Sequence, residues 1–145
     1  MKNISVKEIV CPHVYKKYGD KAIKFLDRDL VAVIEVIRND ILKCPIYINN
    51  GSTLTQRGLR CNICDLCSTK TKNNKMYLSG HVLGRALDFT CKDYTPDEVR
   101  DLILKNENLL PCKIRMESAV DAPTWVHIDT VVAEDQTDKV YVFRA

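Results

Sequence analysis

Two short segments of the chain carry side chains whose types and spacing are suited to metal chemistry. The segment from Ser79 to Asp88 has the sequence SGHVLGRALD, and the segment from Trp125 to Asp129 has the sequence WVHID. Together they supply His81, Asp88 and His127. Three nitrogen and oxygen ligands leave the fourth position of a tetrahedral zinc ion open to water, which is typical of a catalytic zinc. Because zinc lowers the pKa of its bound water to about 7, the pattern predicts a zinc hydrolase.

The backbone between the first two of these residues must bend. His81 and Asp88 stand too far apart to share one helical turn, and Gly84 between them permits a sharp bend because it has no Cβ. The extended run that follows, Ala86 to Thr90, places Asp88 on a strand that faces the site.

The second segment has the alternation of a strand. Trp125, His127 and Asp129 then share one face, with apolar residues on the other. His127 would face the metal, and Trp125 would form a wall of the cleft. Asp129 is either a carboxylate that orients a ligand histidine or a solvated strand residue.

The first segment resembles the S-x-H-x-x-G-x-A-x-D motif of the zinc D-Ala-D-Ala carboxypeptidase family, whose fold is shared with lysostaphin-type enzymes and the hedgehog signalling domain. Trp125-Val126-His127 is similar to a second element of that family, and Gly58-Leu59-Arg60-Cys61 to an upstream segment whose arginine lies near the substrate. The similarity covers roughly residues 46 to 130. It implies that His81, Asp88 and His127 are the metal ligands.

The resemblance also implies a carboxylate base shortly before the last histidine. Glu117 ends a strand-like run in which its apolar neighbours Ile114 and Met116 would face the core, so its side chain would point into the cleft. It stands farther from His127 than is usual in the family, which we attribute to a lengthened hairpin loop. Asp121 has the more usual distance, but an aspartate before Ala-Pro is typical of a turn, so Glu117 is the predicted base.

Two further residues are candidates for contact with substrate. Arg60, with Arg57 as the second choice, would hold a substrate carboxylate through paired hydrogen bonds; the alternative for Arg60 is a solvated loop charge. Ser79 would either donate a hydrogen bond to substrate or shape the turn before His81.

These features predict a zinc metallopeptidase that cuts peptidoglycan stem peptides, as a D,D- or L,D-carboxypeptidase or as an endopeptidase. The expected partner is peptidoglycan or a muropeptide, bound by a monomer. The alternative is a non-catalytic zinc-binding recognition module of the same fold, by analogy with hedgehog domains. The formal net charge of +3 is too small and dispersed to predict a nucleic-acid surface, and no apolar run has the length of a membrane span.

The chain also has seven cysteines, three of them in the C-x-x-C-x-x-C run of Cys61, Cys64 and Cys67. A second, structural metal at this run needs a fourth ligand, for which Cys91 is a candidate; free thiols are the simpler interpretation, and we favour it. His13, which follows Cys11-Pro12 in an expected loop, has no partner pattern and is set aside.

The first eight residues are mixed and polar rather than an apolar signal segment. We therefore expect a protein that is cytoplasmic as synthesised, with reduced thiols, although later release to the cell wall as a phage lysin is compatible with the sequence.

Length and hydrophobic pattern predict a single domain spanning residues 1–145, with an α+β fold in which helices pack on one side of an antiparallel sheet. Apolar residues recur at helical spacing from Asp20 to Lys43, as one long helix or two joined helices, and a capping box at Thr95 opens a helix to about Lys105. Residues 51–80 are expected to be irregular. Strands are predicted at residues 46–48, 86–90, 113–118, 124–132 and 139–143.

Overall fold

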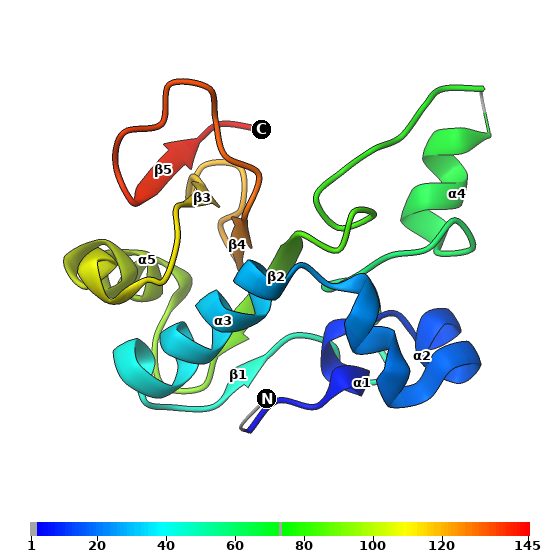
Figure 1. Ribbon diagram of the computed structural model, residues 1–145, viewed down its shortest axis with the longest axis horizontal. Helices are drawn as coiled ribbons and strands as arrows, with labels where there is room; N and C mark the ends of the chain where they lie inside the picture. The colour runs from blue at the N-terminus through cyan, green and yellow to red at the C-terminus, as the bar shows by residue number, and fades with distance from the viewer. Residues whose placement is uncertain (1–2, 73) are drawn as a thin grey trace.

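The computed structural model describes residues 3–72 and 74–145, which form a five-stranded sheet and several helices (Figure 1). Met1 and Lys2, at the start of the polar N-terminal segment, lie outside the described residues. The α-helices are α1 (Val6–Ile9), α2 (Pro12–Tyr18), α3 (Arg28–Val36), α4 (Asp65–Thr71) and α5 (Pro96–Lys105). The helical elements of 3₁₀ or π type are η1 (Gly19–Phe25), η2 (Ile37–Leu42) and η3 (Glu107–Leu109). The strands are β1 (Ile46–Tyr47), β2 (Ala86–Cys91), β3 (Ile114–Glu117), β4 (Val126–Asp129) and β5 (Val140–Phe143).

The sheet has the strand order β1-β2-β4-β3-β5 and is mixed. The pairs β1–β2, β2–β4 and β4–β3 are antiparallel, but β3 and β5 are parallel. The expectation of a purely antiparallel sheet was therefore wrong at this edge. After β4 the chain reverses direction through residues 130–139 and passes β3 to reach the sheet edge, so β5 runs opposite to β4 and hence along β3. The α+β class itself is confirmed.

One face of the sheet is apolar and belongs to the hydrophobic core. Leu87, Phe89, Met116 and Ile128 on this face are at most 1% exposed. Helix α5 packs on β2 and β4 and contacts η2, and apolar side chains of α3 join the same core. The alternate residues of these strands point to the opposite face, where the polar side chains predicted to bind metal lie.

The predicted helices form, but the first is divided. The helix at residues 95–105 begins with the expected capping box, in which the Thr95 and Glu98 side chains each bond the other's backbone. The pattern from Asp20 to Lys43 is divided among η1, α3 and η2, because Leu26 is extended and Asp27 caps α3 through the Asp29 and Leu30 amides.

Helix α4 lies within the region expected to be irregular, so that expectation was wrong for Asp65–Thr71. The helix is too short and polar to show apolar periodicity, with Cys67 its one buried residue. In Figure 1, α1, α2 and α4 lie at the end of the molecule away from α5. No helix in residues 3–72 and 74–145 is long and apolar enough to cross a membrane.

Candidate functional site

His81 lies in a tight turn that precedes β2. The turn closes through hydrogen bonds from the Leu83 amide to the Ser79 carbonyl and from the Arg85 amide to the Gly80 carbonyl, at 3.1 and 2.7 Å. Gly84 has a φ of +69°, and a Cβ on it would lie 2.1 Å from the Phe25 carbonyl oxygen. Only glycine therefore fits at this bend.

The His81 ring is buried and fixed by the backbone of a distant segment. Its side chain is 5% exposed, and its Nδ1 donates to the Gly58 carbonyl at 2.9 Å. This leaves Nε2 directed at the Asp88 carboxylate, 3.2 Å from Oδ2. A backbone partner on one ring nitrogen is the usual way to fix the tautomer of a ligand histidine.

The other candidate residues form one row across the sheet. Asp88 on β2 is directly opposite His127 on β4. Met116 pairs with Ile128, so the next step in the antiparallel register sets Glu117 on β3 opposite His127 from the other side. Directly opposed residues point to the same face of a sheet, so the three side chains lie together on the polar face.

His81, Asp88 and His127 form a group compatible with a metal ion. Their ligand atoms all lie within 4.8 Å of one another. Asp88 lies between the two rings, with Oδ1 2.7 Å from His127 Nδ1 and Oδ2 3.2 Å from His81 Nε2. Two imidazole nitrogens and one carboxylate oxygen thus converge from a turn and two strands, and these are ligand types that bind divalent transition metals.

The electrostatics around these residues favour a cation. Burial by itself would raise the pKa of Asp88, but hydrogen bonds to His127 and His81 hold it well below its ordinary value. Burial by itself would lower the pKa of His127, but its hydrogen bonds to Asp129 and Asp88 raise that pKa to about 9. Two carboxylates thus stabilise positive charge at this ring.

Asp129 orients His127 rather than facing solvent. Its side chain is 2% exposed, and both carboxylate oxygens accept hydrogen bonds from Arg115, from Nε and Nη2 at 2.9 Å each. Its Oδ2 also lies 3.4 Å from His127 Nε2, on the side of the ring away from Asp88. Of the two interpretations left open by the sequence, the structure supports the orienting carboxylate.

Glu117 shares a hollow of about 330 Å³ with both histidines; Asp129, Arg115, Ser79 and Phe143 also line it. Burial raises the pKa of the Glu117 carboxyl above its ordinary value, although the charge of His127 opposes the shift. Asp121, the alternative base, is not among the residues that line this hollow. It instead accepts hydrogen bonds from Arg144 Nε at 2.7 Å and from the Ala145 amide at 3.1 Å.

Arg100 holds the loop between β3 and β4, a role that the sequence did not indicate. From α5, its guanidinium donates to the carbonyls of Glu117, Ala122 and Trp125, at 3.2, 2.6 and 2.7 Å. The residue is 6% exposed. A single buried arginine thus anchors both ends of the loop that separates Glu117 from His127.

Arg60 forms an ion pair with the Asp88 carboxylate. Its Nη2 donates to Asp88 Oδ2 at 3.1 Å and its Nε donates to the Gln56 carbonyl, so it is not a solvated loop charge. Arg60, Arg57, Asp88 and Trp125 line a second hollow of about 320 Å³. Trp125 therefore lines this second hollow and not the hollow that the two histidines share, where it was predicted to form a wall.

Ser79 is placed to shape the turn. Its Oγ accepts from the Val82 amide at 3.4 Å, and the side chain also borders the hollow with the histidines. Of its two predicted roles, hydrogen bonding within the turn is the one that the structure contains.

A second group compatible with a metal ion includes two of the three clustered cysteines. Cys61 and Cys64 converge with Cys11 and His13, not with Cys67 or Cys91. Cys91 instead lies beside Cys44, where burial, with Cys91 nearby, raises the pKa of the Cys44 thiol to about 11. The expectation that His13 lies in a loop without partners was wrong. It lies in the first turn of α2 and belongs to this group.

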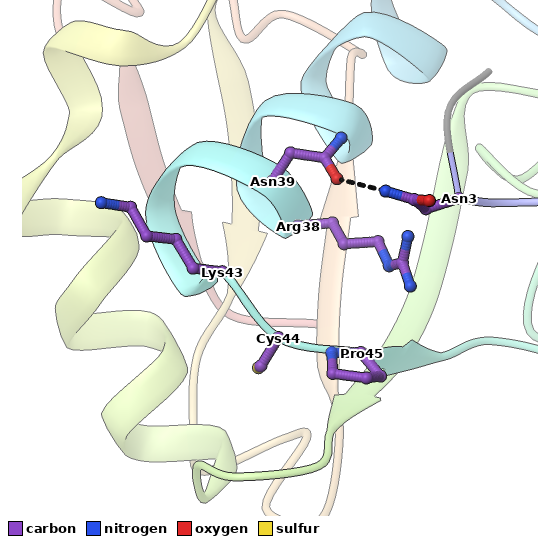
Figure 2. Close-up of a pocket in the computed structure, with 6 residues that line it drawn as sticks. All are labelled: Asn3, Arg38, Asn39, Lys43, Cys44 and Pro45. Atoms are coloured by element: carbon purple, nitrogen blue, oxygen red, sulfur yellow. Dashed lines mark hydrogen bonds between the residues drawn. The ribbon is translucent and has the colours of Figure 1, made fainter.

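A third hollow, of about 340 Å³, lies near the end of η2, where Asn3 donates to Asn39 Oδ1 at 3.3 Å (Figure 2). Arg38, Asn39, Lys43 and Cys44 are among its lining residues. Its described lining includes neither a histidine nor a carboxylate, so we do not consider it a candidate for hydrolytic chemistry.

Comparison with known proteins adds no family to this geometry: no family model, curated protein or solved structure matches the chain.

Proposed function

We propose that this chain is a zinc-dependent peptidase that hydrolyses peptide bonds in peptidoglycan stem peptides. The observation that carries the proposal is the convergence of His81, Asp88 and His127 on one another, with Glu117 lining the same hollow as the two histidines. A ligand set with an open position and an adjacent carboxylate is the arrangement that metal-assisted hydrolysis requires. The substrate class comes from the resemblance of Ser79–Asp88 and Trp125–His127 to the zinc D-Ala-D-Ala carboxypeptidases.

The ligands would be His81 through Nε2, His127 through Nδ1, and the Asp88 carboxylate, because these atoms face one another. When bound there, zinc supplies a Lewis acid that polarises the scissile carbonyl and brings the pKa of water to about 7. The Gly58 carbonyl and the Asp129 carboxylate hold the opposite nitrogens of the two rings, so each ring is pre-oriented.

Glu117 is the proposed general base. Its position opposite His127 places the carboxylate beside the ligands without making it one of them. It would accept a proton from the attacking water and later transfer that proton to the leaving amine. Its raised pKa suits this exchange, since a base whose pKa is nearer the working pH both accepts and returns a proton readily.

Arg60 is the proposed substrate-positioning residue. It lines the hollow that Asp88, Arg57 and Trp125 border, which is separate from the hollow that Glu117 lines. A guanidinium there suits a substrate carboxylate, which it can bind through paired hydrogen bonds. The peptide would then extend from the Arg60 hollow, past Asp88, into the hollow that contains Glu117.

The test is a digest of purified peptidoglycan by the zinc-loaded protein, read by mass spectrometry. We expect loss of a terminal residue or conversion of cross-linked dimers to monomers. Glu117→Gln should lower the rate at least about 100-fold, the lower end of what a positioned base contributes, with zinc content unchanged. Asp121→Asn is the matched control and should retain the rate, because Asp121 binds Arg144 instead of facing the hollow.

Two results would overturn parts of the proposal. Wild-type protein that contains zinc but leaves both peptidoglycan and soluble muropeptides intact would contradict the peptidase and favour a non-catalytic zinc-binding module. Full activity in Glu117→Gln together with loss of activity in Asp121→Asn would transfer the base to Asp121.

A further inference from the structure

We propose that Cys11, His13, Cys61 and Cys64 form a second, structural zinc site. This site would join the N-terminal segment to residues 57–61, which also contact His81 and Asp88. Cys61 Sγ lies 3.7 Å from Cys11 Sγ and 3.9 Å from Cys64 Sγ. His13 Nδ1 lies 3.7 Å from both Cys61 Sγ and Cys64 Sγ. All four ligand atoms are within 4.8 Å of one another.

These separations match the edges of a zinc tetrahedron. With Zn–S bonds of about 2.3 Å and Zn–N bonds of about 2.0–2.1 Å, the ligand atoms are about 3.8 Å apart for two sulfurs and about 3.6 Å apart for sulfur and nitrogen. A disulfide requires two sulfurs about 2.05 Å apart, so Cys61 is too far from both Cys11 and Cys64 to be bonded to either. Three thiolates and one imidazole form a complete ligand set that suits zinc, with no position left for substrate.

The backbone around the cluster is shaped for metal binding. The Cys64 amide donates to the Cys61 carbonyl at 3.1 Å, which closes the tight C-x-x-C turn, and the Ile63 and Cys64 amides are directed at Cys61 Sγ. On the other segment, Cys11 is the N-cap of α2 and Pro12 occupies its first turn, so His13 projects from a fixed backbone. Cys11 and Cys64 are 0% and 1% exposed, whereas His13 is exposed and leaves a route for the ion.

The two segments are already paired next to the cluster. The Cys11 amide donates to the Leu59 carbonyl and the Leu59 amide to the Ile9 carbonyl, both at 2.9 Å. Gly58 packs so closely here that a Cβ would lie 2.1 Å from the Ile9 carbonyl oxygen. Ligands from distant parts of the sequence thus meet at the end of an existing backbone bridge.

The cluster adjoins the segment that contacts the proposed zinc ligands. Just before Cys61, the Gly58 carbonyl accepts from His81, and the Arg57 carbonyl accepts from the Asp88 amide at 2.7 Å. A zinc ion bound by Cys61 would fix this segment against the N-terminal helices. The expected effect of this zinc ion on the histidine site rests on the proposed function, but the proposal that the ion binds here does not.

Metal content and cobalt spectra test the site independently of hydrolysis. We expect wild-type protein, dialysed against a weak chelator, to hold two zinc ions per chain. Cys64→Ala and His127→Ala should each hold one, and the double variant none. Cys67→Ala is the matched control, because Cys67 is also buried and ends the same C-x-x-C-x-x-C run; it should keep both ions.

Substitution with Co²⁺ identifies which ion is lost. Thiolate ligands give cobalt an intense near-ultraviolet charge-transfer band that a site of two histidines and an aspartate lacks. The band should persist in His127→Ala and Cys67→Ala and disappear in Cys64→Ala. One zinc per chain with no thiolate band in wild type, or equal loss of the band in Cys64→Ala and Cys67→Ala, would overturn the proposal.

A variant at the exposed ligand covers the case in which Cys64→Ala does not fold. His13→Ala should weaken binding of the thiolate-bound zinc at least about 10-fold, because losing a residue that merely supports a ligand already costs about 10-fold. His13→Cys should restore the binding. Unchanged affinity in His13→Ala would exclude His13. Two bound ions with the thiolate band but no hydrolysis would contradict the peptidase and leave this site standing, whereas hydrolysis with one ion and no band would do the reverse.

Discussion

Asp129 shows how one buried carboxylate can fix the orientation of a proposed ligand, the His127 ring. It accepts two hydrogen bonds from Arg115 and lies against the His127 nitrogen that faces away from Asp88. Because the arginine fixes the carboxylate, the carboxylate in turn fixes the ring, and His127 Nδ1 is left facing the site.

Asp129→Asn should therefore weaken zinc binding at the histidine site by about 10- to 100-fold, the usual effect of losing a carboxylate that supports a ligand histidine. Competition with a chelator of known affinity measures this. Asp135→Asn, at an exposed position, is the control and should leave binding unchanged. Equal affinities in wild type and Asp129→Asn would show that the carboxylate does not support the ligand.

At the residue scale, the sequence predicted the grouping better than the roles. The histidines and Asp88 converge because their motif and strand alternation specify a face. The role of Asp129 was left open, because alternation gives a face but not burial or a partner. The proximity of Cys11 and His13 to Cys61 and Cys64 could not be predicted, since it depends on the backbone bridge between Val10 and Leu59.

At the scale of elements, the turn between His81 and β2 is specified by one residue. Gly84 combines a φ of +69° with a neighbour, the Phe25 carbonyl oxygen, in the space that a Cβ would occupy. The same turn receives a hydrogen bond at its Gly84 carbonyl from the Asp27 amide, so it is fixed to the start of α3.

Gly84→Ala should destabilise the protein by at least about 3 kcal/mol, because backbone strain and a clash with rigid backbone add together. Gly51→Ala provides the comparison: Gly51 also has a positive φ, +76°, but a Cβ there would meet nothing within 4 Å, so only the strain of about 1 kcal/mol applies. Urea denaturation midpoints measure both. Similar losses in the two variants would contradict the role of the close Phe25 contact.

The helices and strands were predicted correctly where local chemistry determines their type. The predictions failed where pairing of distant segments determines the structure or where the local pattern is too weak. The capping box at Thr95 and the alternation around Met116 specify a helix and a strand on their own. The parallel placement of β5 depends on where the chain goes after β4, which no local pattern encodes. Helix α4 has too little apolar periodicity to be recognised.

At the scale of the whole molecule, the two proposed metal sites lie on either side of the segment that contains Gly58. This segment pairs with the N-terminal bridge through Leu59, and it bonds His81 and the Asp88 amide of the histidine site through Gly58 and Arg57. The ions would therefore connect parts of the chain that come from its beginning, middle and end. A ligand that binds only the folded state stabilises it by an amount that grows with the logarithm of the ratio of free ligand concentration to dissociation constant.

Removal of zinc by a strong chelator should lower the thermal midpoint of the wild type. Each site contributes about 2.7 kcal/mol when free zinc is 100 times its dissociation constant. Scanning calorimetry should therefore find a larger decrease for the wild type than for His127→Ala or Cys64→Ala, each of which has one site to lose. A wild-type midpoint that does not respond to the chelator would argue against both ions.

The hairpin anchored by Arg100 separates distance along the chain from distance in space. Glu117 and His127 are neighbours in strand register, while the residues between them form a loop whose two ends the arginine holds. Insertions in that loop during evolution would leave the pair unmoved, whereas one residue inserted within β3 would turn Glu117 to the apolar face. A search for related sites should therefore describe this pair by strand register and leave the sequence interval open.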